Sequence, residues 1–80
     1  MRKQIIAAIK EVASEQNINI SIDESNFNKP LKEIGIDSIS SISMIVGIEQ
    51  KLGVRVPDEH LPKITSIELL ITEFEQLLQK

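Results

Sequence analysis

The segment Gly35-Ile36-Asp37-Ser38-Ile39 places a glycine shortly before two residues of the kind that begin helices. If a helix begins here, its first N–H groups lack partners and its dipole turns its positive end towards the Ser38 side chain. A phosphate ester on the Ser38 hydroxyl is favourable at such a position. The simpler alternative is that Asp37 or Ser38 only caps the helix, because caps of these types are common. From these residues alone, both interpretations stay open.

Residues suited to catalysis are scarce in the rest of the chain. His60 is the only histidine and stands close to Pro62 in a predicted turn, so we expect a solvated surface residue. Glu73 and Glu75 fall on the polar side of a predicted helix, where we expect a solvated face and no acid/base pair. The absence of cysteine excludes disulfides, a thiol nucleophile and thiolate metal sites. With no HExxH motif and no phosphate-binding glycine loop, we predict a protein that is not an enzyme and binds no metal.

The composition fits one small folded domain spanning residues 1–80, with 41% apolar residues and a net charge of −3. Apart from Arg2-Lys3, the basic residues are scattered, which argues against nucleic acid as a partner. Lys10 and Glu11 interrupt the apolar N-terminal positions, so these do not form a secretion signal, and no stretch is long enough for membrane insertion. We therefore expect a cytoplasmic monomer.

Apolar residues recur at helical spacing in three segments that must position these side chains. The first predicted helix covers residues 2–16 and ends near Asn17, and the second covers residues 37–52 and ends at Gly53. Gly47 inside the second helix costs about 1 kcal/mol relative to Ala. The third runs from about residue 66 to 78, where Thr65-Ser66-Ile67-Glu68 fits a capping box with Thr65 as N-cap and Glu68 reaching back.

Two connections complete the predicted fold. In residues 17–36, Ile18, Ile20 and Ile22 alternate with polar residues, but no second strand is present to pair with them. We expect an extended loop that places isoleucines, Phe27 and Leu31 on a helical core, with one helical turn at residues 31–34. Pro57 begins at most a short helix, which Pro62 limits. The predicted fold is all-α, a small four-helix bundle of three main helices and one short helix, with a long loop between helices 1 and 2.

The second helix carries two apolar faces, whereas one is enough for a small bundle. At 100° per residue, Met44, Ile45, Ile48 and Leu52 share one face. The residues Ile39, Ile42 and Val46 fall on a neighbouring face. An exposed apolar face of this kind marks a partner contact. The alternative is that the helix is simply more deeply buried.

The chain resembles the acyl carrier protein family in three segments. Gly35-Ile36-Asp37-Ser38-Ile39 is similar to the family's Gly-x-Asp-Ser-Leu attachment site, and Val56-Pro57-Asp58-Glu59 is similar to its Ile-Pro-Asp-Glu. Lys63-Ile64-Thr65-Ser66-Ile67 is similar to its Lys-Ile-Thr-Thr-Val. The resemblance covers residues 31–71 without gaps, and three matched segments at the family's spacing are far more specific than one Asp-Ser pair.

The resemblance implies a carrier of acyl thioesters. Ser38 would accept 4′-phosphopantetheine from coenzyme A, transferred by a separate Mg²⁺-dependent phosphopantetheinyl transferase, and the thiol of that arm would hold the cargo. Asp37 and Ile39 would belong to the cofactor site, where Asp37 would help to start the helix and to orient the transferase. Ile39, Ile42, Val46 and Glu49 would contact partner enzymes, which load, extend or transfer the acyl group and supply all the catalytic groups.

The chain departs from the fatty-acid members of the family along the second helix. Ser40 and Ser43 stand where those members have acids, and Glu49-Gln50-Lys51 replaces three acids. Since each exposed charge pair is worth only roughly 0.2–1 kcal/mol, these losses slow association with basic partners more than they abolish it. We therefore hypothesise a carrier for a fatty-acid-like, polyketide or other specialised pathway. The alternatives are an aminoacyl or peptidyl carrier, or a cofactor-free helical adaptor that binds through Ile39, Ile42 and Val46.

Overall fold

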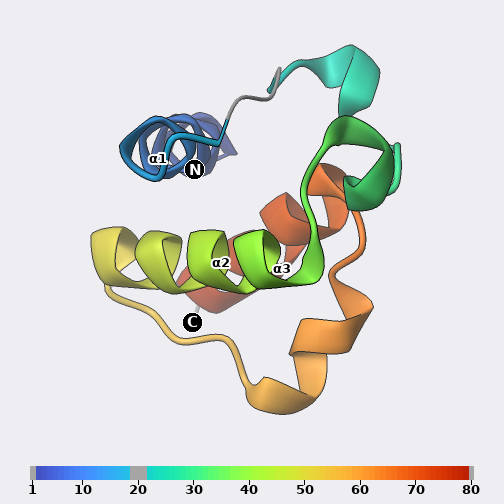
Figure 1. The fold of residues 1–80 in the computed structure, drawn as a ribbon. Coiled ribbons are helices and arrows are strands. Elements are labelled where there is room, and N and C mark those ends of the chain that lie inside the picture. Colours follow the sequence, from blue (N-terminus) through green and yellow to red (C-terminus); the bar gives the residue numbers. More distant parts are fainter. Residues whose placement is uncertain (1, 19–21, 80) are drawn as a thin grey trace.

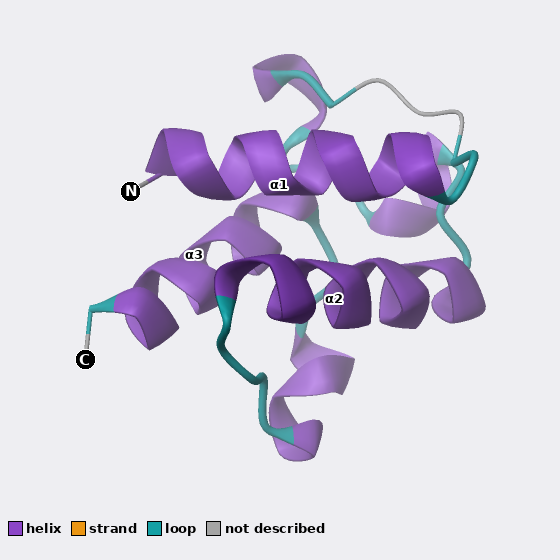
Figure 2. Cartoon of the chain, turned by 90° about the vertical axis from the view of Figure 1, so that its left-hand side faces the viewer, coloured by secondary structure: helices purple, strands orange, loops and turns teal. Residues whose placement is uncertain are grey.

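Three amphipathic segments form the α-helices α1 (Arg2–Glu15), α2 (Ser38–Leu52) and α3 (Ile67–Leu78), close to the predicted bounds. The structure is a computed structural model that describes residues 2–18 and 22–79. Helix α1 lies over α2 in both views of the chain, and α3 lies behind α2 (Figure 1, Figure 2). The short helix η3 (Asp58–Lys63) bridges from α2 towards α3. Within the described residues there is no strand, and the predicted all-α bundle of three main helices and one short helix is confirmed.

The core forms where the apolar stripes of the three helices meet. Phe74, Ile48 and Ile5 are fully buried, one from each helix. The apolar stripe of α3 is buried at Ile67, Leu70, Ile71 and Phe74, whereas Leu77 and Leu78 are only partly buried. No helix in the described part of the chain is both long and apolar enough to cross a membrane.

Helices α1 and α2 approach closely at Gly47. A Cβ atom at this position would lie 2.9 Å from Cγ1 of Val12, closer than a side chain can pack. Beside it, Nε2 of Gln16 donates to the carbonyl of Ser43 at 2.9 Å. The glycine that weakens the helix by propensity therefore permits the contact between the two helices.

The long connection between α1 and α2 is tied to the start of α3. Asn17 ends the first helix in the left-handed conformation, with φ of 57°, as predicted. Phe27 and Leu31 are buried in the core. The carbonyl of Phe27 accepts a hydrogen bond from the N–H of Glu68, and the N–H of Leu31 donates to the carbonyl of Thr65. Ile18 and Ile22 pack against the core as expected, while Ile20 lies outside the described residues.

Two short 3₁₀ helices give this connection its shape: η1 (Glu24–Asn26) and η2 (Leu31–Ile34), where one helical turn was expected. Gly35 ends η2 with φ of 91°, a conformation that strongly favours glycine. The chain thereby turns sharply towards Ser38, so Gly35 sets the approach to α2.

The short helix η3 is longer than the single limited turn that Pro62 suggested. It covers Asp58–Lys63 and includes Pro62. A 3₁₀ helix tolerates this residue because its hydrogen bonds bypass the proline nitrogen. The N–H of His60 donates to the carbonyl of Pro57, and the N–H of Ile64 donates to that of Leu61.

The predicted cap of α3 was wrong by one residue. Ser66, and not Thr65, is the N-cap, and its hydroxyl accepts from the N–H of Leu69 at 3.2 Å. The residue that can reach back to the cap in a capping box is then Leu69, which is apolar. Glu68 instead forms an ion pair with Arg2 at the start of α1.

Ion pairs connect the helices at the periphery. Arg2 bridges Glu68 and Glu75 of α3, and its hydrogen bond holds the pKa of Glu68 below the ordinary value. Lys51 of α2 bridges Glu15 and Glu11 of α1, at 2.9 and 3.2 Å. Glu75 is therefore part of the contact between helices, and the expectation of a merely solvated residue was wrong for it.

Candidate functional site

The start of α2 is capped by Asp37. Its backbone is extended, and its carboxylate accepts a hydrogen bond from the N–H of Ser40 at 2.7 Å. This bond makes the largest contribution to a lowered pKa of Asp37, and a hydrogen bond from the Ser40 hydroxyl lowers the pKa further. Of the two candidate caps, Asp37 and Ser38, it is therefore Asp37 whose side chain caps the helix.

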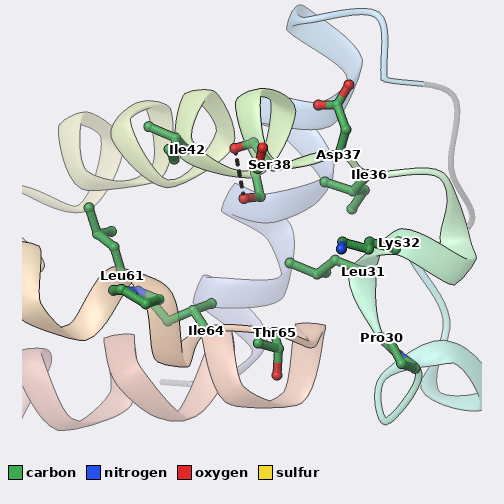
Figure 3. A pocket seen from close by; sticks show the side chains of 12 residues that line it. Pro30, Leu31, Lys32, Ile36, Asp37, Ser38, Ile42, Leu61, Ile64 and Thr65 are labelled. Carbon is green, nitrogen blue, oxygen red and sulfur yellow. Dashed lines mark hydrogen bonds between the residues drawn. The ribbon is translucent and has the colours of Figure 1, made fainter.

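Ser38 is left with a free hydroxyl as the first residue of α2. Its side chain is exposed, and among the described residues no hydrogen bond to this hydroxyl is formed. Only its carbonyl has a local side-chain partner, the hydroxyl of Ser41 at 3.2 Å (Figure 3). Capping therefore does not explain the Ser38 side chain, and its hydroxyl is open to reaction.

A pocket of about 340 Å³ lies beside Ser38. The start of α2, the helix η2 and the helix η3 each contribute to its walls (Figure 3). Leu31, Ile36, Ile42, Leu61 and Ile64 make most of the wall apolar, while Ser38, Ser41, Thr65, Lys32 and Asp37 add polar groups. The pocket joins segments far apart in the sequence, and the spacing of the motif residues gives no signal for Lys32, Ser41 or Leu61.

The second apolar face of α2 is exposed, as predicted. Ile39 is 79% exposed, Ile42 49% and Val46 45%. Met44, Ile45 and Ile48 of the other face are buried, and Leu52 is partly buried against the core. From Ser38 to Ile48 the helix has no charged residue. The helix thus offers an uncharged apolar surface next to Ser38, and the alternative of a wholly buried helix is excluded.

Glu49, the fourth predicted partner residue, has an internal contact. Its carboxylate accepts a hydrogen bond from the N–H of Val56 and so anchors the segment that follows α2. Its side chain is only partly exposed, unlike the neighbouring Gln50. A contact between Glu49 and a partner stays a prediction.

His60 is not the free surface residue that was expected. Its Nδ1 lies 2.9 Å from Oε2 of Glu73, whose side chain is only 14% exposed. The pair connects η3 to α3, so Glu73 is not part of a solvated face either. Neither residue lines the pocket beside Ser38. In the described part of the chain, no group of three or more His, Cys, Asp or Glu side chains is placed to hold a metal ion.

Known proteins match this arrangement over nearly the whole chain. The profile of the family described as "Phosphopantetheine attachment site" matches residues 3–74. An acyl carrier protein homolog of Mycoplasma genitalium is 36% identical over 77 residues, which cover 96% of this chain and 92% of that protein. The chain belongs to the acyl carrier protein family. Its members are carriers and not catalysts, and the family implies a covalently attached 4′-phosphopantetheine group.

Two further relatives agree with this assignment. An acyl carrier protein homolog of Ureaplasma parvum is 42% identical over 71 residues, covering 89% of this chain and 90% of that protein. The crystal structure of an acyl carrier protein from Thermotoga maritima superimposes with a TM-score of 0.82 and 31% identity, covering 98% of this chain and 91% of that one. The carrier fold and the carrier role therefore rest on both sequence and structure.

The residues at the start of α2 fit a phosphopantetheine group. Such a group needs a hydroxyl that a large transferase can reach, and the Ser38 hydroxyl is exposed and unbonded within the described structure. The N-terminus of a 15-residue helix favours the negative phosphodiester. The pocket beside Ser38 leaves room for the adjoining part of the arm. When bound, the group supplies the thiol that this cysteine-free chain lacks.

Proposed function

We propose that Ser38 is the attachment residue and that residues 1–80 act as a single domain carrying acyl groups as thioesters on the phosphopantetheine arm. The observation that carries this proposal is the division of roles at the start of α2. Asp37 caps the helix through its side chain, which leaves the exposed hydroxyl of Ser38 without a structural task. Asp37 and Ile39 flank this hydroxyl, where a transferase must approach it.

The attachment reaction uses coenzyme A and a separate phosphopantetheinyl transferase with Mg²⁺. The oxygen of Ser38 attacks the phosphorus next to the pantetheine, an O–P bond forms, and the bond to the adenosine bisphosphate breaks. A base of the transferase takes the hydroxyl proton. Within this chain, the positive end of the α2 dipole favours the negative product.

The face formed by Ile39, Ile42 and Val46 is proposed as the surface that the transferase and the acyl-handling enzymes contact. Its exposure supports this role, because each of these side chains leaves apolar area in water that a partner can cover. Ile39 also follows Ser38 directly, so an enzyme acting at Ser38 or on its arm meets this face first.

The pathway is proposed to be a specialised one. The support is the charge pattern of α2, which has no charged residue from Ser38 to Ile48. Further along, Lys51 is paired with Glu15 and Glu11, and Glu49 is bonded to the backbone. A partner that docks through a Lys/Arg patch finds few free acids on this helix. Partners with an apolar docking surface fit it better.

The attachment proposal is tested by intact mass after incubating the purified chain with coenzyme A, Mg²⁺ and a broad-specificity transferase. The native chain gains one phosphopantetheine, Ser38→Ala gains none, and the matched control Ser43→Ala, also exposed on α2, gains one. An unmodified native chain would leave a cofactor-free adaptor as the better description. A modified Ser38→Ala chain would move the attachment to another residue.

The pathway proposal is tested with housekeeping fatty-acid enzymes acting on the holo chain. We expect malonyl loading and elongation to be slower than on a typical acidic carrier. We also expect the charged variant Ser40→Asp/Ser43→Glu to recover part of the rate. Rates equal to those of the acidic carrier would refute the specialised role and leave Ser38 attachment untouched.

A further inference from the structure

Lys32 is the one cation among the described residues that line the pocket beside Ser38. It belongs to η2 (Leu31–Ile34), and its side chain extends towards the pocket (Figure 3). It forms no ion pair within the described part of the chain, in contrast to Arg2 and Lys51, which bridge carboxylates. An unpaired ammonium thus faces the space next to the attachment residue.

The charge balance at this pocket changes when Ser38 is modified. The only carboxylate lining the pocket, within the described residues, is that of Asp37. Figure 3 shows this carboxylate pointing away from the pocket. It accepts a hydrogen bond from the N–H of Ser40. A phosphodiester on Ser38 adds one negative charge next to Asp37. The cation positioned to compensate for that charge is Lys32.

We propose that the ammonium of Lys32 binds the phosphodiester of the phosphopantetheine arm and holds the first part of the arm over the pocket. This inference rests on the proposed attachment at Ser38. A positively charged, hydrogen-bond-donating lysine is suited to a phosphate oxygen, since charge-assisted hydrogen bonds of this kind are stronger than neutral ones. With its phosphate held, the arm starts beside the apolar wall formed by Ile42 and Leu61 rather than extending freely into water.

The contact is measured by nuclear magnetic resonance on the holo chain. A chain labelled with ¹³C and ¹⁵N is modified with unlabelled coenzyme A, and isotope-filtered NOEs are recorded between the protein and the arm. We expect NOEs from the Hε protons of Lys32 to the methylene next to the phosphate, and a change in the Lys32 Cε–Hε resonances between apo and holo chains. The matched control Lys29 is exposed on the same connection and does not line the pocket, so it shows neither.

Substitutions provide the second readout. Lys32→Gln is expected to shift the ³¹P resonance of the arm and to abolish its dependence on salt between low and high ionic strength. Lys29→Gln leaves both unchanged. Lys32 resonances that coincide in apo and holo chains, without NOEs to the arm, would overturn the contact while the attachment stands. A chain that gains no phosphopantetheine in the mass measurement would overturn the attachment and this inference together.

Discussion

Asp37 and Ser38 differ by one position and have different tasks, because an N-cap must have an extended backbone while the next residue is already helical. Sequence alone left open which of the two caps α2. The hydrogen bond from the Ser40 N–H to Asp37 decides the matter. It also makes the stability of α2 depend on the ionisation of one carboxylate.

The first prediction concerns the pH dependence of this cap. The pKa of Asp37 is lowered in the folded chain, so its stabilising effect is fully present above the ordinary Asp pKa of 3.8 and is lost as pH falls through the folded value. Asp37→Asn keeps a capping side chain that does not titrate. We expect the urea midpoint of the native chain to exceed that of Asp37→Asn at pH 6, and this difference to shrink progressively as the pH is lowered below 3.8. A difference independent of pH would show that the charge of Asp37 has no role.

The cap of α3 illustrates why a cap is hard to assign from sequence. Thr65 and Ser66 are neighbours, and both residue types are favoured at the N-cap of a helix. The capping-box spacing to Glu68 favoured Thr65. The backbone decided otherwise, because Ser66 forms a β-bridge with Pro30, a residue distant in the sequence. A contact of this range leaves no trace in the local pattern.

The second prediction follows from this correction. Ser66→Ala removes the hydroxyl that accepts from Leu69 and is expected to lower the free energy of unfolding by about 1 kcal/mol. Thr65→Ala, next to it, is expected to cost less than about 0.5 kcal/mol, because Thr65 is exposed and is not the cap. Urea denaturation of both variants measures this. Equal losses, or a larger loss for Thr65→Ala, would restore the original assignment.

At the scale of the helices, periodicity alone predicted α1, α2 and α3 well, because each helix buries one stripe of apolar residues in the shared core. It predicted the connections less well. The helix η3 continued through Pro62, and the contacts of His60 with Glu73 and of Arg2 with Glu68 join side chains from different elements. Helical spacing has no information on such pairs.

The third prediction concerns the contact between α1 and α2 at Gly47. Ala has the higher helix propensity by about 1 kcal/mol, but its Cβ would overlap Val12, and overpacking of this kind costs about 1–3 kcal/mol. We expect Gly47→Ala to lower the free energy of unfolding by about 1 kcal/mol, as measured by chemical denaturation. In the Val12→Ala background the same change is expected to stabilise the chain. A stabilising Gly47→Ala in the native background would contradict the close approach.

The fourth prediction separates the two faces of α2. Ile39→Ser is expected to change the free energy of unfolding by less than about 0.5 kcal/mol, because Ile39 is 79% exposed. Ile48→Ala, on the buried face, is expected to cost about 2–5 kcal/mol. If Ile39 contacts the transferase, Ile39→Ser also lowers kcat/KM for modification roughly fivefold to tenfold. An unchanged kcat/KM would remove Ile39 from the partner surface.

At the scale of the whole molecule, the fold brings three distant segments to one place. The start of α2 supplies Ser38, η2 supplies Lys32, and η3 supplies Leu61 to a single pocket. The attachment residue could be predicted from the sequence, because helix start signals and the resemblance both point to it. The pocket and Lys32 could not, since they depend on how η2 and η3 pack beside α2.

Four serines stand close together at the start of α2. Ser38, Ser40, Ser41 and Ser43 stand within six residues, and their hydroxyls are chemically alike. The structure distinguishes them by position: the Ser40 hydroxyl interacts with Asp37, Ser41 donates to the carbonyl of Ser38, and Ser43 lies a full turn into the helix. Only Ser38 combines the first helical position with a side chain that is free within the described structure.

The most direct measurement is therefore the location of the arm in the holo chain by proteolysis and fragment-ion mass spectrometry. Our account predicts that the fragment ions place one phosphopantetheine on Ser38 and none on Ser40, Ser41 or Ser43. An arm found on any of those three residues, or a chain that a transferase leaves unmodified, would contradict it.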